Sequence, residues 1–303
     1  MHFYAFNWKL SIMSLLSVIF ALIAESFISN LSDLRRFDFF YRYVSWLRAK
    51  LPSFSFQNGT VTLIIVLAGL LFSVWLVSAM LGNVLGLFGF LFGIAVLIFM
   101  IGPRDLEKDS QKVITALENN DYEGANFYAS NLTAEDISEH PMQLAQTVKE
   151  NILLQANTRM LGVFFWFILL GPVGAVLFRA SCLLKENQQS ETDDFSVASR
   201  DLYRIMIWLP ARICVLSFAV AGNFVDTMSY WKGLSDLWLR DSEEFIIVSG
   251  VGALRYERRI ERAGIENEEP DINGIHHAMS LVKRAVIVWV VLLALLTVTG
   301  WLF

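Results

Sequence analysis

The residues best suited to chemistry form a short run, Trp-Leu-Pro-Ala-Arg at residues 208–212, which heads an apolar segment. Arg212 keeps its positive charge at any ordinary pH, and a guanidinium at membrane depth is costly unless a partner lies nearby. Pro210 removes one backbone donor and is expected to break the helix beside it. Arg212 is therefore either a binding group for an anionic ligand or an edge residue whose head group extends to the lipid headgroups.

A second group of candidate residues lies in and before the preceding apolar segment. Its members are Asn157, Arg159, Gly171, Pro172, Gly174 and Arg179. The proline removes a backbone donor and the glycines permit a change of direction, so we expect residues 160–184 to form a kinked or re-entrant span. A helix broken at membrane depth usually lines a cavity, because its freed backbone groups need partners there.

The bulk composition indicates an integral membrane protein. Of the 303 residues, 55% are hydrophobic and 17% are charged, and the mean hydropathy is +0.50; a water-soluble domain rarely shows such values. The net charge of −5 leaves no basic face of the kind that nucleic acids require, so we exclude nucleic acid as a partner. Cys182 and Cys214 have neither the spacing of a disulfide framework nor that of a zinc site, and we expect no metal.

Hydropathy predicts an all-α fold, a polytopic membrane helical bundle of about six spans with helical cytoplasmic inserts. The expected spans are residues 10–24, 61–80, 84–101, 160–184, 206–222 and 285–303. If the spans at 160–184 and 206–222 are both re-entrant, about four full spans remain. The expected domains are three spans at 1–102 with an amphipathic cytoplasmic loop at 26–60, a helical insert at 103–158, the broken spans with the candidate pocket at 159–222, a second cytoplasmic region at 223–280 and a terminal span at 281–303.

Positive charges set the expected orientation. The loops 26–60, 103–159 and 223–284 hold 18 of the 24 lysines and arginines, which predicts that these loops face the cytoplasm. No GxxxxGK[ST] run is present, so a P-loop nucleotide site is not expected. Four arginines of the last loop recur at helical spacing with acidic residues between them, which is typical of a solvated helix face, with anion binding as the alternative: Arg255, Arg258, Arg259 and Arg262.

Several motifs together resemble a known group of proteins. In chain order they are Asn157-x-Arg159 before Phe164-Phe165-Trp166, Leu-Gly-Pro at 170–172 with Gly174, Phe178-Arg179, the run at 208–212, Ala-Met-Ser-Leu-Val-Lys-Arg-Ala at 278–285, and Ala-Leu-Leu-Thr at 294–297 before Gly300. In this order they resemble the AmpE and CobD/CbiB group of bacterial inner-membrane proteins, and AmpE most closely. The resemblance extends from about residue 106 to the end of the chain, and the first hundred residues match in pattern only.

The two branches of this group imply different functions. Proteins similar to CobD are ATP-dependent ligases that join an aminopropanol arm to a corrinoid carboxylate, and such chemistry needs acidic residues to hold magnesium. The acids of that branch are replaced here by Ala156, Tyr203 and Arg204, and Asp201 is close but out of register. These departures argue against ligase activity. The AmpE branch implies a sensory or regulatory membrane protein linked to β-lactamase induction and cell-wall signalling.

From the resemblance and the residues together we hypothesise that one pocket at the cytoplasmic membrane surface binds an anionic small molecule without turnover. Its lining would comprise Asn157, Arg159, Arg179 and Arg212. The lipid bilayer and a second copy of the chain are the other partners considered, and the sequence names no cofactor. One alternative is a cobinamide-phosphate synthase-like ligase that takes its carboxylates from Asp105, Glu150 or Asp201. The other is a transporter, which would require internal repeats that the sequence does not show.

Overall fold

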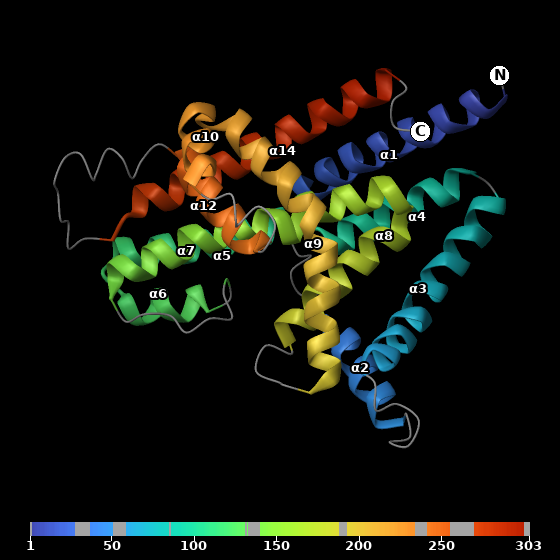
Figure 1. Ribbon diagram of the computed structural model, residues 1–303, viewed down its shortest axis with the longest axis horizontal. Coiled ribbons are helices and arrows are strands. Elements are labelled where there is room, and N and C mark those ends of the chain that lie inside the picture. Colours follow the sequence, from blue (N-terminus) through green and yellow to red (C-terminus); the bar gives the residue numbers. More distant parts are fainter. Residues whose placement is uncertain are drawn as a thin grey trace. The chain divides into compact units, whose positions relative to one another are not determined.

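Most of the described residues of the chain are helical. A computed structural model describes residues 2–27, 37–50, 59–84, 86–130, 132, 140–187, 193–233, 241–254 and 270–299, and these residues contain helices and no strand (Figure 1). The helices are α1 (His2–Phe27), α2 (Asp38–Lys50), α3 (Gly59–Val84), α4 (Gly86–Met100), α5 (Pro103–Glu118), α6 (Tyr122–Ala129), α7 (Pro141–Ala156), the π-helical turn η2 (Asn157–Leu161), α8 (Gly162–Asn187), α9 (Asp194–Ala221), α10 (Phe224–Gly233), α12 (Ser242–Leu254) and α14 (Ile272–Val298).

Several of these helices are long and apolar enough to cross a membrane. Within the described residues, five segments qualify by length and composition: Gly59–Gly82, Gly86–Glu118, Pro141–Asn187, Asp194–Ala221 and Ile272–Val298. A shorter apolar helix covers Met13–Glu25. A membrane span needs about 20 predominantly apolar residues. The prediction of an all-α, polytopic membrane protein is therefore confirmed.

Contacts divide the chain into two compact units. The first comprises Met1–Gly102, Gly162–Ile207 and Leu293–Phe303, and the second comprises Pro103–Leu161 and Trp208–Leu292. In the first unit α4 packs against α1, α3 and α8. Phe20 of α1 meets Phe90 of α4 edge to face, with ring centroids 6.2 Å apart. Between membrane helices, such close packing provides much of the stabilisation, because lipid chains are as apolar as the side chains themselves.

Helix α2 is fixed to α3 by one side chain. The Tyr43 hydroxyl donates a hydrogen bond to the Val66 carbonyl at 3.0 Å. A Cβ atom on Gly69 would lie 2.6 Å from the same hydroxyl oxygen, so the approach of α2 requires a residue without a side chain at this position. Phe40, Val44 and Phe195 belong to the buried cluster beneath α2.

Helix α8 changes direction at Gly171. This residue has φ 66° and ψ −153°, outside the helical region, while the residues on both sides are helical. Only glycine adopts such a backbone conformation readily, and Pro172 follows with no N–H to donate. The predicted kink in residues 160–184 is therefore confirmed.

The predicted break at Pro210 was wrong. Helix α9 begins at Asp194 and runs through Pro210 to Ala221. A proline within a helix leaves the carbonyl four residues earlier without its backbone donor. Here that carbonyl belongs to Met206, and it accepts a hydrogen bond from Trp166 Nε1 at 2.9 Å. A side chain of α8 thus replaces the missing donor, and the helix continues.

Helix α9 also begins well before the span expected at residues 206–222. Helix α8 extends to Asn187 and α9 already begins at Asp194. The Asp193 carboxylate accepts hydrogen bonds from the Ser196 backbone N–H at 3.1 Å and from the Ser196 hydroxyl. This side chain caps the helix and so allows it to begin before the apolar segment.

The capping residue Asp193 also forms an ion pair with Arg48 of α2, and the stability that this pair contributes should decrease at acid pH. Arg48 Nη2 lies 2.6 Å from Asp193 Oδ2. Burial alone would raise the Asp193 pKa, but the two hydrogen bonds from Ser196 and the Arg48 charge lower the pKa below its ordinary value. A carboxylate with a depressed pKa stabilises the fold above its ordinary pKa, and this contribution is lost as the pH falls through the folded-state value.

We therefore expect Asp193→Asn to lower the melting temperature in detergent at neutral pH, and the difference from wild type to shrink at about pH 3. The effect is modest, because both side chains are about a third exposed or more and water screens the pair. Asp201→Asn, which removes a more exposed carboxylate of the same helix, is the matched control. A melting difference that stays constant between neutral and acid pH would contradict the assignment.

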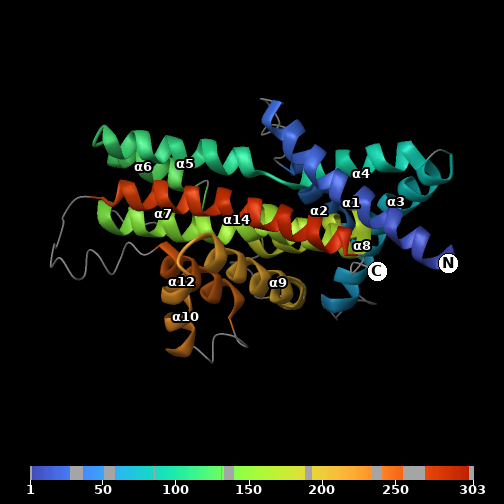
Figure 2. The ribbon, with the colours of Figure 1, turned by 90° about the horizontal axis from the view of Figure 1, so that it is seen from above.

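The second unit contains α5, α6, α7, η2, the part of α9 from Trp208 onward, α10, α12 and the first part of α14. Helices α5 and α6 lie side by side, as do α10 and α12 (Figure 2). Asp121 caps α6 by accepting a hydrogen bond from the Gly124 N–H at 2.9 Å. A Cβ atom on Gly250 of α12 would lie 2.9 Å from a Leu153 methyl group of α7, so these two helices are in close contact. Lys283 Nζ of α14 pairs with Glu107 Oε1 of α5 at 2.6 Å.

Candidate functional site

Arg212 is enclosed by protein. Its side chain belongs to α9 in the second unit and is 4% exposed. Nη1 donates hydrogen bonds to the Trp208 carbonyl at 2.8 Å and to the Ser242 hydroxyl. The guanidinium carbon lies 4.7 Å from the Trp208 ring centroid and 5.6 Å from that of Phe245. The head group therefore does not extend outward from the helix, so the interpretation of Arg212 as an edge residue that reaches the lipid headgroups is wrong. The binding of an anionic ligand by Arg212 stays a prediction.

The main hydrogen-bond partner of Arg212 outside its own helix stands at the start of α12. Ser242 is the first residue of that helix and is itself buried. Asp241 precedes it and accepts hydrogen bonds from the backbone N–H groups of Glu243 at 2.9 Å and Glu244 at 3.1 Å. The carboxylates of Asp241, Glu243 and Glu244 are neighbours of Ser242 in the chain, but Asp241 and Glu244 are exposed whereas Arg212 is buried. The arginine can hold an anionic group, and a carboxylate can accept a proton.

Aromatic side chains fix the position of α12 beside Arg212. Trp231 of α10 donates from Nε1 to the Ser249 hydroxyl at 2.9 Å. Its ring centroid lies 5.8 Å from that of Phe245, the same ring that lies under the guanidinium. Planar aromatic faces attract cations, the more so when water is excluded. Aromatic contacts therefore connect α10, α12 and the Arg212 guanidinium.

Asn157 is fully buried and carries an amide with no hydrogen-bond partner among the described residues, neither at Nδ2 nor at Oδ1. It opens η2, the π-helical turn that also contains Arg159. A buried polar group without a partner costs about 1–3 kcal/mol, so such a group usually has a ligand or functional reason. Single π-helical turns occur frequently at functional sites. Asn157 is thus a second candidate binding group in the second unit.

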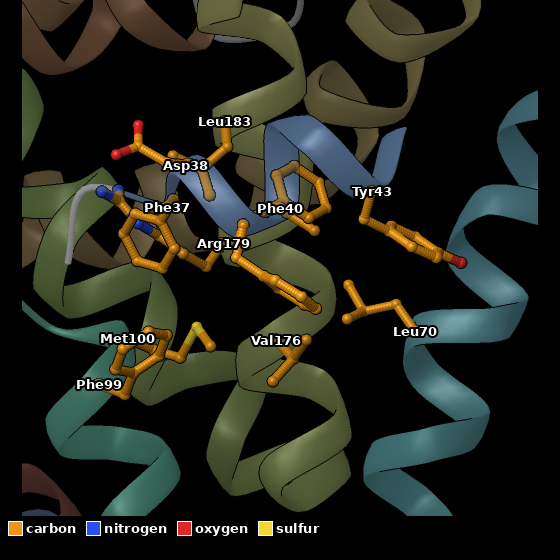
Figure 3. A pocket seen from close by; sticks show the side chains of 12 residues that line it. Phe37, Asp38, Phe40, Tyr43, Leu70, Phe99, Met100, Val176, Arg179 and Leu183 are labelled. Carbon is orange, nitrogen blue, oxygen red and sulfur yellow. The ribbon is translucent and has the colours of Figure 1, made fainter. Parts of the chain in front are cut away.

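Arg179 belongs to the first unit, as do Gly171, Pro172 and Gly174 on the same helix α8. It lines a cavity formed by α2, α3, α4 and α8 (Figure 3). Asn157, Arg159, Pro210 and Arg212 lie in the second unit. The single pocket lined by all three arginines therefore stays a prediction.

Tyr41 of α2 interacts electrostatically with Arg179 but cannot neutralise it. Burial raises the pKa of Tyr41 to about 12, and the charges of Glu186 and Asp38 act in the same direction, against the opposite effect of Arg179. The phenol is therefore uncharged at physiological pH. Tyr41 therefore supplies no negative charge beside Arg179.

The three positions at which the resemblance implied acids, 156, 203 and 204, carry none in this chain. Ala156 is buried, and the ring of buried Tyr203 lies 5.3 Å from Lys185 Nζ. Arg204 is exposed and pairs with Asp201 at 3.5 Å. Across the described residues, no three His, Cys, Asp or Glu side chains are grouped so that they could hold a metal ion. Magnesium in nucleotide sites is often held by only one or two carboxylates together with phosphates, and we assign no magnesium site here.

Sequence reasoning missed Ser242 and Phe245, the two residues of α12 that contact Arg212. A signal was available, because Asp241 and Glu244 have the spacing of a helix-capping box and so mark a helix start. The arginines at 255–262, interpreted above as a solvated face or an anion site, lie outside the described residues.

Comparison with known proteins gives a consistent result. The CobD/CbiB protein family matches residues 18–244. The cobalamin biosynthesis protein CobD of Stutzerimonas stutzeri is 26% identical over 245 residues, which cover 76% of this chain and 78% of that protein. The cobalamin biosynthesis protein CobD of Chromobacterium violaceum is 23% identical over 201 residues, which cover 65% of this chain and 63% of that protein. No solved structure matches.

These comparisons correct two expectations. The family match begins at residue 18 and ends at 244, whereas the sequence resemblance was expected from about residue 106 to the end. The expected regulatory function linked to β-lactamase induction is contradicted, because both of these relatives are named cobalamin biosynthesis protein CobD. The AmpE branch was favoured because three positions, 156, 203 and 204, lack acids. These are only three positions within a family match that spans residues 18–244. The chain belongs to the CobD/CbiB family.

Proposed function

We propose that this protein acts in cobalamin biosynthesis as a membrane-embedded amide ligase that joins an aminopropanol-type arm to a corrinoid carboxylate. The observation that carries this proposal is the family match over residues 18–244, which includes Arg212 and its partner Ser242. Both relatives are named cobalamin biosynthesis proteins, which supports a role of this protein in that pathway. The charge distribution of the loops supports a place in the bacterial inner membrane.

The chemistry of amide formation fits an enclosed arginine. A carboxylate and an amine condense only if one carboxylate oxygen is expelled, and in ATP-dependent ligases that oxygen leaves with phosphate. Both the carboxylate and the phosphate are anions, and a planar guanidinium binds either through two parallel hydrogen bonds. Arg212 is held in place by Trp208, Ser242 and Phe245, so little reorganisation is needed when the anion arrives.

The amine must also lose a proton as the amide forms. Asp241, Glu243 and Glu244 flank Ser242 in the chain, and they are within the stretch matched by the family. We propose that one of these carboxylates accepts the proton, in place of acids at positions 156, 203 and 204. Asn157 supports the proposal as a further neutral hydrogen-bonding group that is buried without a partner among the described residues.

The test is an assay of the purified protein in detergent with ATP, a corrinoid carboxylic acid and aminopropanol or its phosphate. We expect mass spectrometry to detect the amide product, and we expect the gene to restore corrinoid production in a strain that lacks CobD. The Stutzerimonas stutzeri relative serves as the parallel control. If that relative restores production and this protein neither does so nor forms the product, the ligase assignment is wrong. If the protein binds the corrinoid but forms no amide product, the proposed ligase activity is wrong and only the proposed corrinoid-binding site stands.

A further inference from the structure

The first unit contains a cavity of about 300 Å³ between α2, α3, α4 and α8. Its walls are mostly apolar and include Phe37, Phe40, Leu70, Phe99 and Val176 (Figure 3). This volume is at the lower end of the range for ligand sites in proteins. All of the lining residues belong to the first unit.

One cation lies in this apolar wall. Of the lining residues, Arg179 alone is positively charged. Its Nε and Nη1 atoms are covered by protein and have no hydrogen-bond partner among the described residues. The guanidinium carbon lies 5.2 Å from the Phe37 ring centroid. Covered donors of a permanent cation are costly to leave unsatisfied, which favours an anionic ligand at this place.

The other polar groups of the lining do not compete for that role. Tyr43 already donates its hydroxyl hydrogen to the Val66 carbonyl. Asp38 is exposed, and Figure 3 shows its carboxylate directed away from the apolar side chains. No ion pair joins Asp38 to Arg179 among the described contacts. The cavity thus combines one unsatisfied cation with an apolar interior.

The surroundings identify the chemical class of the ligand. Helices α3, α4 and α8 belong to segments with the length and composition of membrane spans. Helix α2 is amphipathic, and it exposes Phe39 at 77% and Trp46 at 55% together with basic residues at its end. Aromatic and basic side chains on such a helix are typical of the membrane interface. A ligand with an anionic head and an apolar body matches this position.

We propose that this cavity binds an anionic phospholipid, with its phosphate on Arg179 and the first part of one acyl chain against Phe99, Leu70 and Val176. The volume is too small for a whole lipid, so the remainder of the chain lies along the outside of the spans. This site is separate from the proposed ligase function and does not depend on it.

The experiment measures lipid binding to the purified protein by native mass spectrometry, with phosphatidylglycerol and phosphatidylcholine of the same chain length. We expect wild type to bind phosphatidylglycerol about tenfold or more tightly than phosphatidylcholine. Arg179→Gln should weaken phosphatidylglycerol binding by about 10- to 100-fold, as expected for the loss of charge-assisted hydrogen bonds. Arg42→Gln is the matched control, because Arg42 is an exposed arginine of α2 that contacts only the Asp38 carbonyl among the described groups.

A second variant tests the apolar part of the site with the charge left intact. Val176→Phe fills the interior and should also abolish binding of the phospholipid, while inorganic phosphate should not compete with the lipid in either protein. Equal binding of the two lipids, unchanged binding by both Arg179→Gln and Val176→Phe, or full displacement by inorganic phosphate would overturn the proposal. These readouts use no corrinoid, so their failure leaves the ligase proposal standing, and failure of the ligase assay leaves this site standing.

Discussion

Replacing Arg212 with glutamine should reduce amide formation by about 10- to 100-fold. The change keeps a polar side chain of similar length but removes the charge that holds the reacting anion. A hydrogen bond to a charged group contributes about 1.5–3 kcal/mol, and each 1.36 kcal/mol corresponds to a factor of ten in rate. Rates of product formation in detergent, measured at saturating ATP and varied corrinoid, check this result.

The matched control is Arg204→Gln on the same helix. Arg204 is exposed and pairs with Asp201 at 3.5 Å at the surface, so its replacement should leave the rate within about twofold of wild type. Arg212→Lys tests the role of the planar fork, and it should recover only part of the rate because an ammonium cannot make the paired contact. If Arg212→Gln retains the full rate while both proteins elute as a single species, Arg212 does not bind the reacting anion.

Gly171→Ala should destabilise the protein by about 1–3 kcal/mol, because the backbone at this position lies in a region that other residues rarely adopt. No heavy atom within 4 Å would meet the new methyl group, so the cost comes from the backbone alone. A lower melting temperature in detergent, by several degrees, is the expected result.

Gly82→Ala is the control for this change. Gly82 also has no neighbour within 4 Å of an added Cβ atom, but it lies in helix α3 without a positive φ. The melting temperature of Gly82→Ala should therefore stay at or above that of wild type, since alanine favours helix more than glycine does. Equal losses of stability in the two variants would mean that the backbone at Gly171 adopts an ordinary conformation.

The sequence allowed the bundle and the kink at Gly171 to be anticipated, because both follow from local rules, whereas it left the enclosure of Arg212 open against a position at the edge of the membrane. An apolar run of sufficient length predicts a span, and Gly-Pro within it predicts a change of direction. The same rule failed at Pro210, where the side chain of Trp166 satisfies the Met206 carbonyl. That contact joins residues 40 positions apart in the sequence, so it is not visible in any local pattern.

The candidate site was only partly predictable for a related reason. Arg212 is conspicuous as a charge at the head of an apolar segment, whereas its partner Ser242 is 30 positions further on and belongs to a different helix. The choice between two branches of one family rested on three positions that lack acids. Sequence identity of 26% over 245 residues was the stronger indication of the family branch, because it draws on 76% of the chain, whereas the missing acids concern three positions.

The placement of the two cysteines provides a way to follow the two units separately during unfolding. Cys182 belongs to the first unit and Cys214 to the second, both are buried, and neither forms a disulfide. A buried thiol reacts with a maleimide dye only after its surroundings open. Variants that retain a single cysteine, Cys182→Ser or Cys214→Ser, would each give a fluorescent signal from one unit alone. Labelling rates measured at increasing temperature would then reveal whether the two units unfold together or one after the other.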